Sequence, residues 1–281
     1  MQFSQCFDDF SESEDDSFIF IVKENDLLLY NNEIPKKSEF KDFLSPKGTV
    51  FLGKGLSFGR LDGRLCFVFS MKEDDVSSVF AEGILPDVFA FISVREIFLN
   101  RDSDLSKAAA IALHFTFWNN HSRFCGSCGA RNIWENTLTA KKCPECGYVQ
   151  FPKISPAIII AVSKGDELLL AHNANFPEGR YSVLAGFMEM GESIEETAAR
   201  EVREEVGIDI KNIQYYSSQS WPFPDSLMIG LTAEYDSGEI VSDGIEILHA
   251  DWYSPDNFPD IPGHGTIARK LIEYTKRKNK S

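Results

Sequence analysis

The first third of the chain contains short apolar runs separated by polar stretches. Between Ser17 and about Val94, runs such as Phe18–Val22 and Leu65–Phe69 alternate with turn-like segments such as Lys23–Asp26 and Leu61–Arg64. Short apolar runs bounded by Gly, Asn and Asp are typical of strands joined by tight turns. The pattern therefore predicts a mostly β region built of hairpins.

A different pattern follows. An alanine-rich stretch near Asp104–Asn119 predicts a linker helix. Further on, apolar runs predict strands near Ala157–Val162 and Glu167–Ala171, then a glycine-bounded helix, two more strands and a C-terminal helix from about Thr266. This order favours an α+β or α/β domain in which a mixed sheet lies between helices.

These patterns divide the chain into three expected domains. Residues 1–120 form a β-rich N-terminal domain with its linker helix, residues 121–152 form a segment with four cysteines, and residues 153–281 form the α/β domain. A chain of 281 residues is long enough for such an arrangement.

Composition and charge limit the classes of function. Hydrophobic residues make up 43% of the chain and charged residues 25%, which is ordinary for a globular protein. The net charge of -15 argues against broad, sequence-blind binding of nucleic acid, which depends on Lys and Arg. This negative net charge is compatible with a small anionic ligand that is held by a metal ion and a local pocket.

The ends and the apolar runs predict the location of the protein. The acidic start, MQFSQCFDDFSESEDD, lacks a basic segment followed by an apolar one, so we expect no signal peptide. No apolar run reaches the roughly 18 residues of a membrane span, so we expect no membrane association. A cytoplasmic protein is the expectation, and its six cysteines should be thiols or metal ligands.

Four cysteines have the spacing of a metal site. Cys125 and Cys128 form one C-x2-C pair, Cys143 and Cys146 form another, and fourteen residues separate the pairs. Two such turns present four thiolates to one tetrahedral ion, which predicts one structural zinc per subunit with no open position for chemistry. The neighbouring glycines Gly126, Gly129 and Gly147 provide the flexible backbone that such turns need.

The cysteine segment also leaves an alternative open, because zinc ribbons often bind nucleic acid. Cys6 and Cys66, outside the two pairs, are interpreted as buried or incidental cysteines.

An acidic helix is predicted after Ser193. Ser193 and Glu196 form a capping box, and Gly207 fits the left-handed residue that ends a helix. On a helical wheel, Glu201 and Glu205 fall beside the apolar stripe, and Glu204 lies just outside them. The stripe consists of Ile194, Ala198, Val202 and Val206.

Two carboxylates one turn apart beside a core repel each other, and burial raises the cost. A divalent cation between Glu201 and Glu205 would offset both effects, and such oxygen ligands suit Mg²⁺ or Mn²⁺. The alternative is a solvated acidic face in which Arg200 and Arg203 pair with glutamates.

The stretch Gly186–Ile208 matches the Nudix box at every position: Gly, five residues, Glu, seven residues, Arg-Glu, apolar, any, Glu-Glu, any, Gly, apolar. The chain thus resembles Nudix hydrolases, which cut nucleoside diphosphates linked to another group. The resemblance implies that Glu201, Glu204 and Glu205 are catalytic and that Glu192 pairs with Arg200. It also implies that the Mg²⁺ or Mn²⁺ ligands are Glu201, Glu205, the backbone carbonyl of Ala185 and, from a later segment, Glu246.

A second motif lies ten residues after the box. In Ser218-Gln-Ser-Trp-Pro-Phe-Pro-Asp-Ser226, each large aromatic precedes a proline that restricts its backbone, which suits stacking on a flat base. A packed turn is the plainer interpretation. The segment resembles the Ser-Gln-Pro-Trp-Pro-Phe-Pro-x-Ser motif of the NADH pyrophosphatase (NudC-type) family, which also has a zinc ribbon and a divergent β-rich N-terminal domain. Ser220 and Asp225 depart from that motif.

The resemblance covers the chain from about Phe124 to the C-terminus and implies a substrate site. Phe187 would stack on the nicotinamide or adenine, and Phe151 and Ala268 match positions that approach the ligand in the family. Family members are homodimers with shared sites, so a homodimer is expected. The motif residues expected to bind the substrate are Gln219, Ser220, Trp221, Pro222, Phe223, Pro224, Asp225 and Ser226.

The resemblance implies hydrolysis of the pyrophosphate of NAD(H) to AMP and nicotinamide mononucleotide, oxidised or reduced (NMN or NMNH). It also implies removal of the NAD cap from RNA 5′ ends. Alternatives are a Nudix hydrolase for another nucleoside diphosphate derivative such as ADP-ribose, a zinc-ribbon RNA-binding module whose Nudix domain is inert, and a scaffold. The intact acids argue against inertness, and the acidic balance argues against general RNA affinity.

Overall fold

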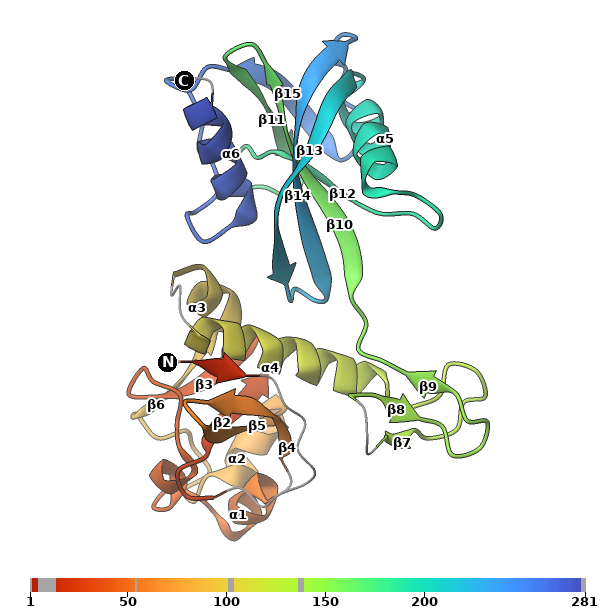
Figure 1. The fold of residues 1–281 in the computed structure, drawn as a ribbon. Coiled ribbons are helices and arrows are strands. Elements are labelled where there is room, and N and C mark those ends of the chain that lie inside the picture. Colours follow the sequence, from red (N-terminus) through yellow and green to blue (C-terminus); the bar gives the residue numbers. More distant parts are fainter. Residues whose placement is uncertain (1, 5–13, 54, 101–103, 136–138, 279–281) are drawn as a thin grey trace. The chain divides into compact units, whose positions relative to one another are not determined.

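The computed structural model describes residues 2–4, 14–53, 55–100, 104–135 and 139–278 (Figure 1). The chain divides into two compact units. One comprises residues 1–153 with 222–224, and the other comprises residues 154–221 with 225–281. The division of the chain into three domains stays a prediction, and Cys6 lies outside the described residues.

The first unit contains a six-stranded sheet. The predicted turns do close two antiparallel hairpins, β2–β3 and β4–β5, but β2 also pairs with β5 in parallel. The predicted hairpins are therefore present, and a parallel pair that was not predicted joins them in one mixed sheet. The strands in sheet order are β1 (Phe3–Ser4), β4 (Leu56–Leu61), β5 (Arg64–Ser70), β2 (Phe18–Lys23), β3 (Asp26–Tyr30) and β6 (Phe89–Ser93).

Helices cover both faces of this sheet (Figure 1). Phe20 and Val22 of β2 pack toward the alanines of the long helix α4, whereas Ile19 and Ile21 pack on the opposite face. A strand buried on both faces needs apolar residues at every position, which explains the unbroken run in β2. The helices are α1 (Pro46–Leu52), α2 (Val76–Val79), α3 (Val94–Asn100) and α4 (Asp104–His121), with 3-10 turns at Lys37–Phe40 and Glu73–Asp75.

The predicted linker helix is confirmed in α4, which extends two residues beyond the expected end. A small three-stranded antiparallel sheet follows it within the same unit and carries the four cysteines. Cys66, expected to be buried or incidental, is fully buried in the core between the first sheet and α4. The strands of the small sheet are β7 (Ile133–Trp134), β8 (Lys141–Lys142) and β9 (Val149–Gln150).

The second unit is a mixed sheet between two helices, as predicted (Figure 1). The central strand β10 pairs in parallel with β14 and antiparallel with β11 and β12. Helix α5 (Ile194–Val206) covers one face, and α6 (Ile267–Lys278) covers the other. The strands are β13 (Asp209–Trp221), β14 (Ser226–Ser237), β10 (Ser155–Lys164), β11 (Glu167–Asn173) and β15 (Ile247–Tyr253) in sheet order, with β12 (Leu184–Phe187) beside β10.

The expected two strands after the acidic helix were one too few, because β13, β14 and β15 all follow α5. Strand β12, which precedes α5, was also not predicted. It has only four residues, which is too short for an alternating pattern to stand out. In β15 the buried residues Ile247 and Ala250 are three positions apart, because a register shift opposite His172 and Asn173 disturbs the alternation.

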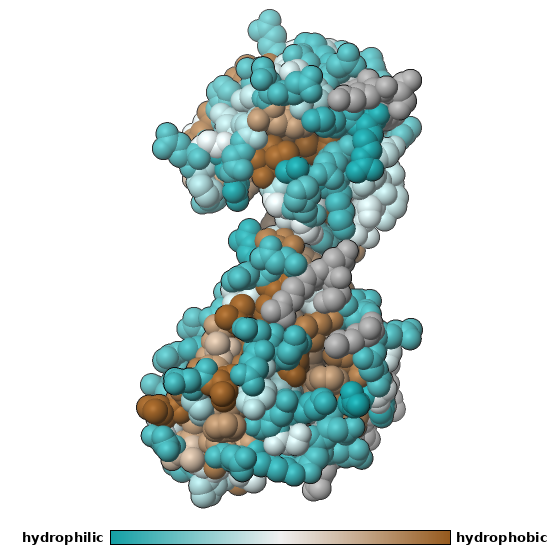
Figure 2. All heavy atoms as spheres, turned by 90° about the vertical axis from the view of Figure 1, so that its left-hand side faces the viewer, coloured by the Kyte–Doolittle hydropathy of each residue, from teal (hydrophilic) through white to brown (hydrophobic). Residues whose placement is uncertain are grey.

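The space-filling view in Figure 2 shows a surface that is largely hydrophilic, interrupted by small groups of apolar residues in each unit. Such scattered groups are normal on a folded protein. Among the residues that the structure describes, no helix combines the length and apolarity needed to cross a membrane.

Candidate active site

The acidic helix α5 begins and ends where the sequence predicts. The Ser193 hydroxyl accepts a hydrogen bond from the Glu196 N–H at 3.2 Å, and Glu196 in turn accepts one from the Ser193 N–H at 2.8 Å. Gly207 ends the helix with φ 75°, in the left-handed region that favours glycine. Because the helix begins after Ser193 and ends before Gly207, the direction in which each of its glutamates points from the helix axis is determined.

The wheel correctly placed the three central glutamates. Ala198, Val202 and Val206 are fully buried against the sheet. Glu205 is also buried, with 5% of its surface exposed, whereas the Glu204 side chain is 61% exposed. The Glu201 side chain is 14% exposed and lies between these extremes. The solvated acidic face is therefore the wrong interpretation for Glu205 and Glu201.

Glu205 is the most unusual of these acids. Its Oε2 atom is buried and has no hydrogen-bond partner in the structure. Burial, followed by the nearby charges of Glu201 and Glu246, raises the pKa of Glu205 to about 8. A buried carboxylate oxygen without a hydrogen-bond partner raises the free energy of the folded protein. Its presence here indicates that it binds a ligand that the protein itself does not supply.

Glycine at position 186 makes room for Glu201. A Cβ atom built on Gly186 would lie 2.0 Å from the carboxylate carbon of Glu201, which is far inside van der Waals contact. Gly186 lies on β12 next to Ala185, whose carbonyl is a predicted metal ligand. The glycine thus lets a carboxylate lie directly against the backbone of this strand.

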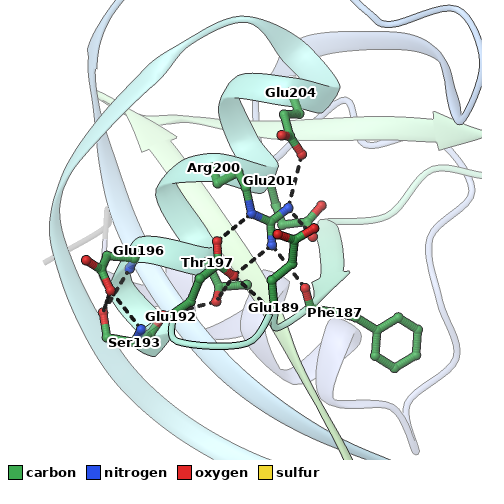
Figure 3. A network of polar contacts seen from close by, with 9 residues as sticks. All are labelled: Phe187, Glu189, Glu192, Ser193, Glu196, Thr197, Arg200, Glu201 and Glu204. Carbon is green, nitrogen blue, oxygen red and sulfur yellow. Dashed lines mark hydrogen bonds and ion pairs between the residues drawn. The ribbon is translucent and has the colours of Figure 1, made fainter.

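Arg200 organises the acidic side chains around it (Figure 3). It binds Glu192 through two hydrogen bonds, with Nε–Oε1 at 2.6 Å and Nη2–Oε2 at 2.9 Å, as the box resemblance predicts. Its Nη1 also donates to Glu201 at 2.9 Å and to Glu204 at 3.0 Å, and Nη2 donates to the Phe187 carbonyl at 3.1 Å. Through these hydrogen bonds Arg200 lowers the pKa of Glu192 to about 2.

The Arg200 guanidinium therefore donates hydrogen bonds to three carboxylates, those of Glu192, Glu201 and Glu204. No such cation among the described residues binds Glu205. The pKa of Glu201 is raised by burial, even though Arg200 acts in the opposite direction. The cluster is thus deficient in positive charge on the side of Glu201 and Glu205 that faces away from Arg200. A divalent cation would supply that charge.

Glu246 is exposed, and it lies in a loop built around Asp243. The Asp243 carboxylate accepts hydrogen bonds from the N–H groups of Ile245 at 3.1 Å, Glu246 at 3.1 Å and Ile247 at 2.8 Å. The N–H of Asp243 donates to the Glu205 carbonyl at 3.1 Å. Asp243 was missed by sequence reasoning, although Asp followed by Gly is a usual signal for a turn of this kind.

Asp243→Ala is expected to raise the concentration of Mn²⁺ needed for half-maximal activity by about tenfold, the usual effect of losing an outer-shell support. The loop that carries Glu246 would lose three hydrogen bonds to one side chain. Asp243→Asn is the matched control, because Oδ1 accepts all three bonds and an amide keeps that oxygen. Metal titrations of activity measure the effect, and an unchanged requirement in the alanine variant would contradict this role.

The side-chain oxygens of Glu201, Glu205 and Glu246 do not all lie within 4.8 Å of one another. Within the described part of the chain, the four cysteines are the one group of three or more His, Cys, Asp or Glu whose ligand atoms all lie within 4.8 Å of one another. The oxygens of these glutamates are nevertheless the hard donors that Mg²⁺ and Mn²⁺ prefer, and the orphaned Glu205 oxygen fits such an ion.

The residues expected at the substrate site lie on several elements. Gln219 lies near the end of β13, and its side chain donates to the Gly265 carbonyl at 2.9 Å and accepts from the Ile267 N–H at 2.8 Å. The structure thereby brings Gln219 to the start of α6, where Ala268 is buried in the core. Phe187 ends β12 with 59% of its surface exposed.

The remaining motif residues are in or beside the turn between two strands. Ser220 and Trp221 close β13, Ser226 opens β14 and pairs with Trp221, and the Asp225 carbonyl accepts from the Ser155 N–H at 2.8 Å. Pro222, Phe223 and Pro224 group with the first unit, as does Phe151, which is 56% exposed. Their roles in substrate binding stay predictions.

The four cysteines form two matching turns. The Gly129 N–H donates to the Cys125 carbonyl at 2.9 Å, and the Gly147 N–H donates to the Cys143 carbonyl at 3.0 Å. Both glycines have positive φ, at 78° and 76°, whereas Gly126 does not, so the flexibility expected of Gly126 is not used. Backbone N–H groups of Cys128 and Ser127 lower the pKa of Cys125 to about 7, which favours the thiolate form.

The Sγ atoms of Cys125 and Cys146 lie 3.6 Å apart, and those of Cys128 and Cys143 lie 3.4 Å apart. Four sulfur atoms gathered in this way can hold one tetrahedral metal ion. The strands of this segment contain two residues each, so they provide little core of their own.

Removal of metal from this cysteine site by a strong chelator is therefore expected to unfold residues 121–152 and to release one Zn²⁺ per chain. Faster proteolysis between His121 and Pro152, together with metal analysis, measures this. A segment that keeps its resistance to proteolysis after losing its metal would contradict a structural role.

The chain is similar to several known proteins. Residues 153–274 match the NUDIX domain family. The NAD-capped RNA hydrolase NudC of Pseudomonas aeruginosa is 46% identical over 191 residues, which cover 68% of this chain and 69% of that protein. NudC of Stutzerimonas stutzeri is 44% identical over 222 residues, covering 78% and 77%. A NUDIX hydrolase structure from Nitrosomonas europaea aligns with a TM-score of 0.46 and 25% identity, over 56% of this chain and 90% of that one.

This chain belongs to the Nudix hydrolases and, within them, to the NudC-type family.

Proposed function

We propose that this protein hydrolyses the pyrophosphate bond of NAD(H) to AMP and NMN or NMNH, and that it removes the NAD cap from RNA 5′ ends. The observation that carries the proposal is the buried, unpartnered Oε2 of Glu205 beside the acids of the Nudix box. The relatives named NAD-capped RNA hydrolase NudC support the choice of substrate.

Nudix hydrolases use divalent metal ions. In this chain the ligands of Mg²⁺ or Mn²⁺ would be Glu201, Glu205, Glu246 and the carbonyl of Ala185. A metal ion held there would polarise the phosphoryl oxygens and lower the pKa of a water molecule. Glu205 and Glu201 fit because their carboxylates are desolvated and deficient in positive charge.

The protein's own side chains would orient the reaction. Arg200 donates to Glu201 and Glu204 through Nη1 and to the Phe187 carbonyl and Glu192 through Nη2, so it links the helix to β12 and to the box loop. Glu204, whose side chain is 61% exposed and accepts a hydrogen bond from Arg200, would be the candidate to accept a proton from the attacking water. The released proton then passes to solvent.

Substrate recognition would come from the aromatic residues Phe151, Phe187, Trp221 and Phe223, which suit stacking on the two bases. The protein would act as a homodimer, and the cysteine site would hold one structural Zn²⁺ per subunit. The support for zinc is the set of four sulfur atoms within 4.8 Å of one another.

The proposal is tested by measuring turnover of NADH, NAD⁺, ADP-ribose and NAD-capped RNA side by side, with Mg²⁺ and with Mn²⁺. Faster cleavage of NADH and capped RNA than of ADP-ribose is the expected result. A preference for ADP-ribose would keep the Nudix chemistry but would show that Ser220 and Asp225 accompany a change of substrate. Tight binding of uncapped RNA with no turnover of any substrate would favour an inert RNA-binding module.

A further inference from the structure

The three-stranded sheet that carries the cysteines has two unlike faces. In its register, Ile133 lies opposite Lys142, which lies opposite Val149, and Trp134 lies opposite Lys141. Opposed residues share a face of a sheet, and successive residues alternate between faces. Trp134 and Lys141 are therefore on one face, and Ile133, Lys142 and Val149 are on the other.

The face with Trp134 and Lys141 packs within the first unit. The Trp134 ring stacks on Phe115 of α4 with centroids 5.6 Å apart and an angle of 17°. Lys141 is buried, and its Nζ donates to the Asn119 carbonyl at 2.8 Å and lies 5.5 Å from the centroid of the Trp118 ring. Trp134 and Lys141 therefore contact the linker helix α4 from this face.

The opposite face exposes apolar and basic side chains. Phe124 pairs with Arg131 across the first cysteine turn, and Arg131 precedes Ile133 by two residues, so all three share this face. Phe124 is 58% exposed and Ile133 is 55% exposed, and Arg131 and Lys142 are exposed as well. We call Phe124, Arg131, Ile133 and Lys142 the outer ribbon face.

The charge of this segment is opposite to that of the chain. Residues 121–153 carry five Lys or Arg and two Glu, and four thiolates around one Zn²⁺ would add a charge of -2, so the segment stays slightly positive in a protein whose net charge is -15. Lys142 has an ion pair with Glu135 at 3.8 Å. A pair of that length between partly exposed side chains is weak, so it competes little with another anion.

We propose that the outer ribbon face binds single-stranded RNA. Phe124 provides a ring on which a base stacks, and Arg131 and Lys142 bind backbone phosphates, which is how sequence-tolerant single-strand binding works. A second copy of this chain is the alternative occupant, and a change of oligomeric state in the variant described below would reveal it. The inference rests on the proposed activity toward capped RNA.

The test compares the wild type with the triple variant Phe124→Ala, Arg131→Ala, Lys142→Ala. The matched control is Lys47→Ala, Val50→Ala, Lys107→Ala, which also removes two exposed cations and one exposed apolar side chain, but elsewhere in the first unit. The probe is a fluorescent 20-nucleotide single-stranded RNA with a 5′-monophosphate, and anisotropy is followed across a range of salt. NADH turnover and zinc content are measured on the same preparations.

The ribbon variant is expected to bind RNA about tenfold or more weakly, the effect of losing one stacking contact. The slope of log affinity against log salt should fall by about 1.4, because two phosphate contacts are lost. NADH turnover, zinc content and the control variant should match the wild type. RNA affinity equal to wild type, or a change of oligomeric state in its place, would overturn the inference.

The same data separate this inference from the proposed function. A wild-type protein that turns over neither NADH nor capped RNA would contradict the proposed function itself, whatever the RNA affinity. Normal NADH turnover with unchanged RNA binding in the ribbon variant would overturn only the role of the outer ribbon face. Loss of zinc from the variant would shift the test to Phe124→Ala alone, for which weaker RNA binding is again the expected result.

Discussion

Glu205→Gln is expected to lower turnover by about a thousandfold, equivalent to about 4 kcal/mol of transition-state stabilisation. The substitution keeps the shape of a buried side chain and removes the charge that would hold the metal. Because Oε2 of Glu205 has no partner in the protein, the loss would come from the metal and not from a broken hydrogen bond. Glu195→Gln is the matched control, since Glu195 is an exposed acid on the same helix.

The same variant is expected to make the metal-free protein more stable near pH 8. The pKa of Glu205 is raised from 4.5 to about 8 in the folded state. Between these two pH values the unfolded chain releases a proton that the folded chain keeps, so folding stability falls as pH rises through this window. Glutamine has no proton to lose, and it should recover up to about 4 kcal/mol at pH 8, the cost that a pKa shift from 4.5 to about 8 implies.

Denaturant unfolding at pH 5 and pH 8 in the presence of a chelator measures this effect. The difference in stability between Glu205→Gln and the wild type should be larger at pH 8 than at pH 5, and saturating Mn²⁺ should reverse the order of the two proteins. Wild-type turnover in Glu205→Gln, or a stability difference that does not depend on pH, would contradict the role given to Glu205.

Gly186→Ala is expected to lower kcat by about a hundredfold or more while the protein stays folded. The new methyl group would lie 2.0 Å from the carboxylate carbon of Glu201, so Glu201 must move away from β12 and from the Ala185 carbonyl. Arg200 would move with it, because its Nη1 binds Glu201 at 2.9 Å. The metal site would therefore lose its geometry through a single added carbon atom.

Gly263→Ala is the control for Gly186→Ala, because a Cβ at position 263 meets no atom within 4 Å. It should leave kcat unchanged. Circular dichroism and the midpoint of thermal unfolding would show whether the Gly186 variant is folded. A folded Gly186→Ala protein with normal kcat would mean that the position of Glu201 against β12 is not needed for activity.

Some features of the site could be predicted from the sequence because they depend on local pattern. The capping box at Ser193, the left-handed Gly207 and the burial of Glu205 all follow from spacing along one helix. The two cysteine turns are local in the same way. Periodicity of 3.6 residues is enough to place a side chain on the inner or outer side of a helix.

Other features depend on contacts between distant segments, which spacing does not report. The parallel pairing of β2 with β5 joins segments 48 residues apart in register, from Phe18 with Cys66 onward. The Asp243 loop matters because its backbone reaches the Glu205 carbonyl from another part of the chain. Gln219 was predicted as a substrate ligand, and the structure shows that its amide also binds the start of α6.

The central claim is that the acids of α5 direct a metal-dependent cleavage of the pyrophosphate in NAD(H). The most direct test is to incubate metal-free protein with NADH, add Mg²⁺ or Mn²⁺, and separate the products by chromatography. Equal amounts of AMP and reduced nicotinamide mononucleotide, formed only after the metal is added and not by Glu205→Gln, are the predicted result. Intact NADH under all conditions, or cleavage at any bond other than the pyrophosphate, would contradict the claim.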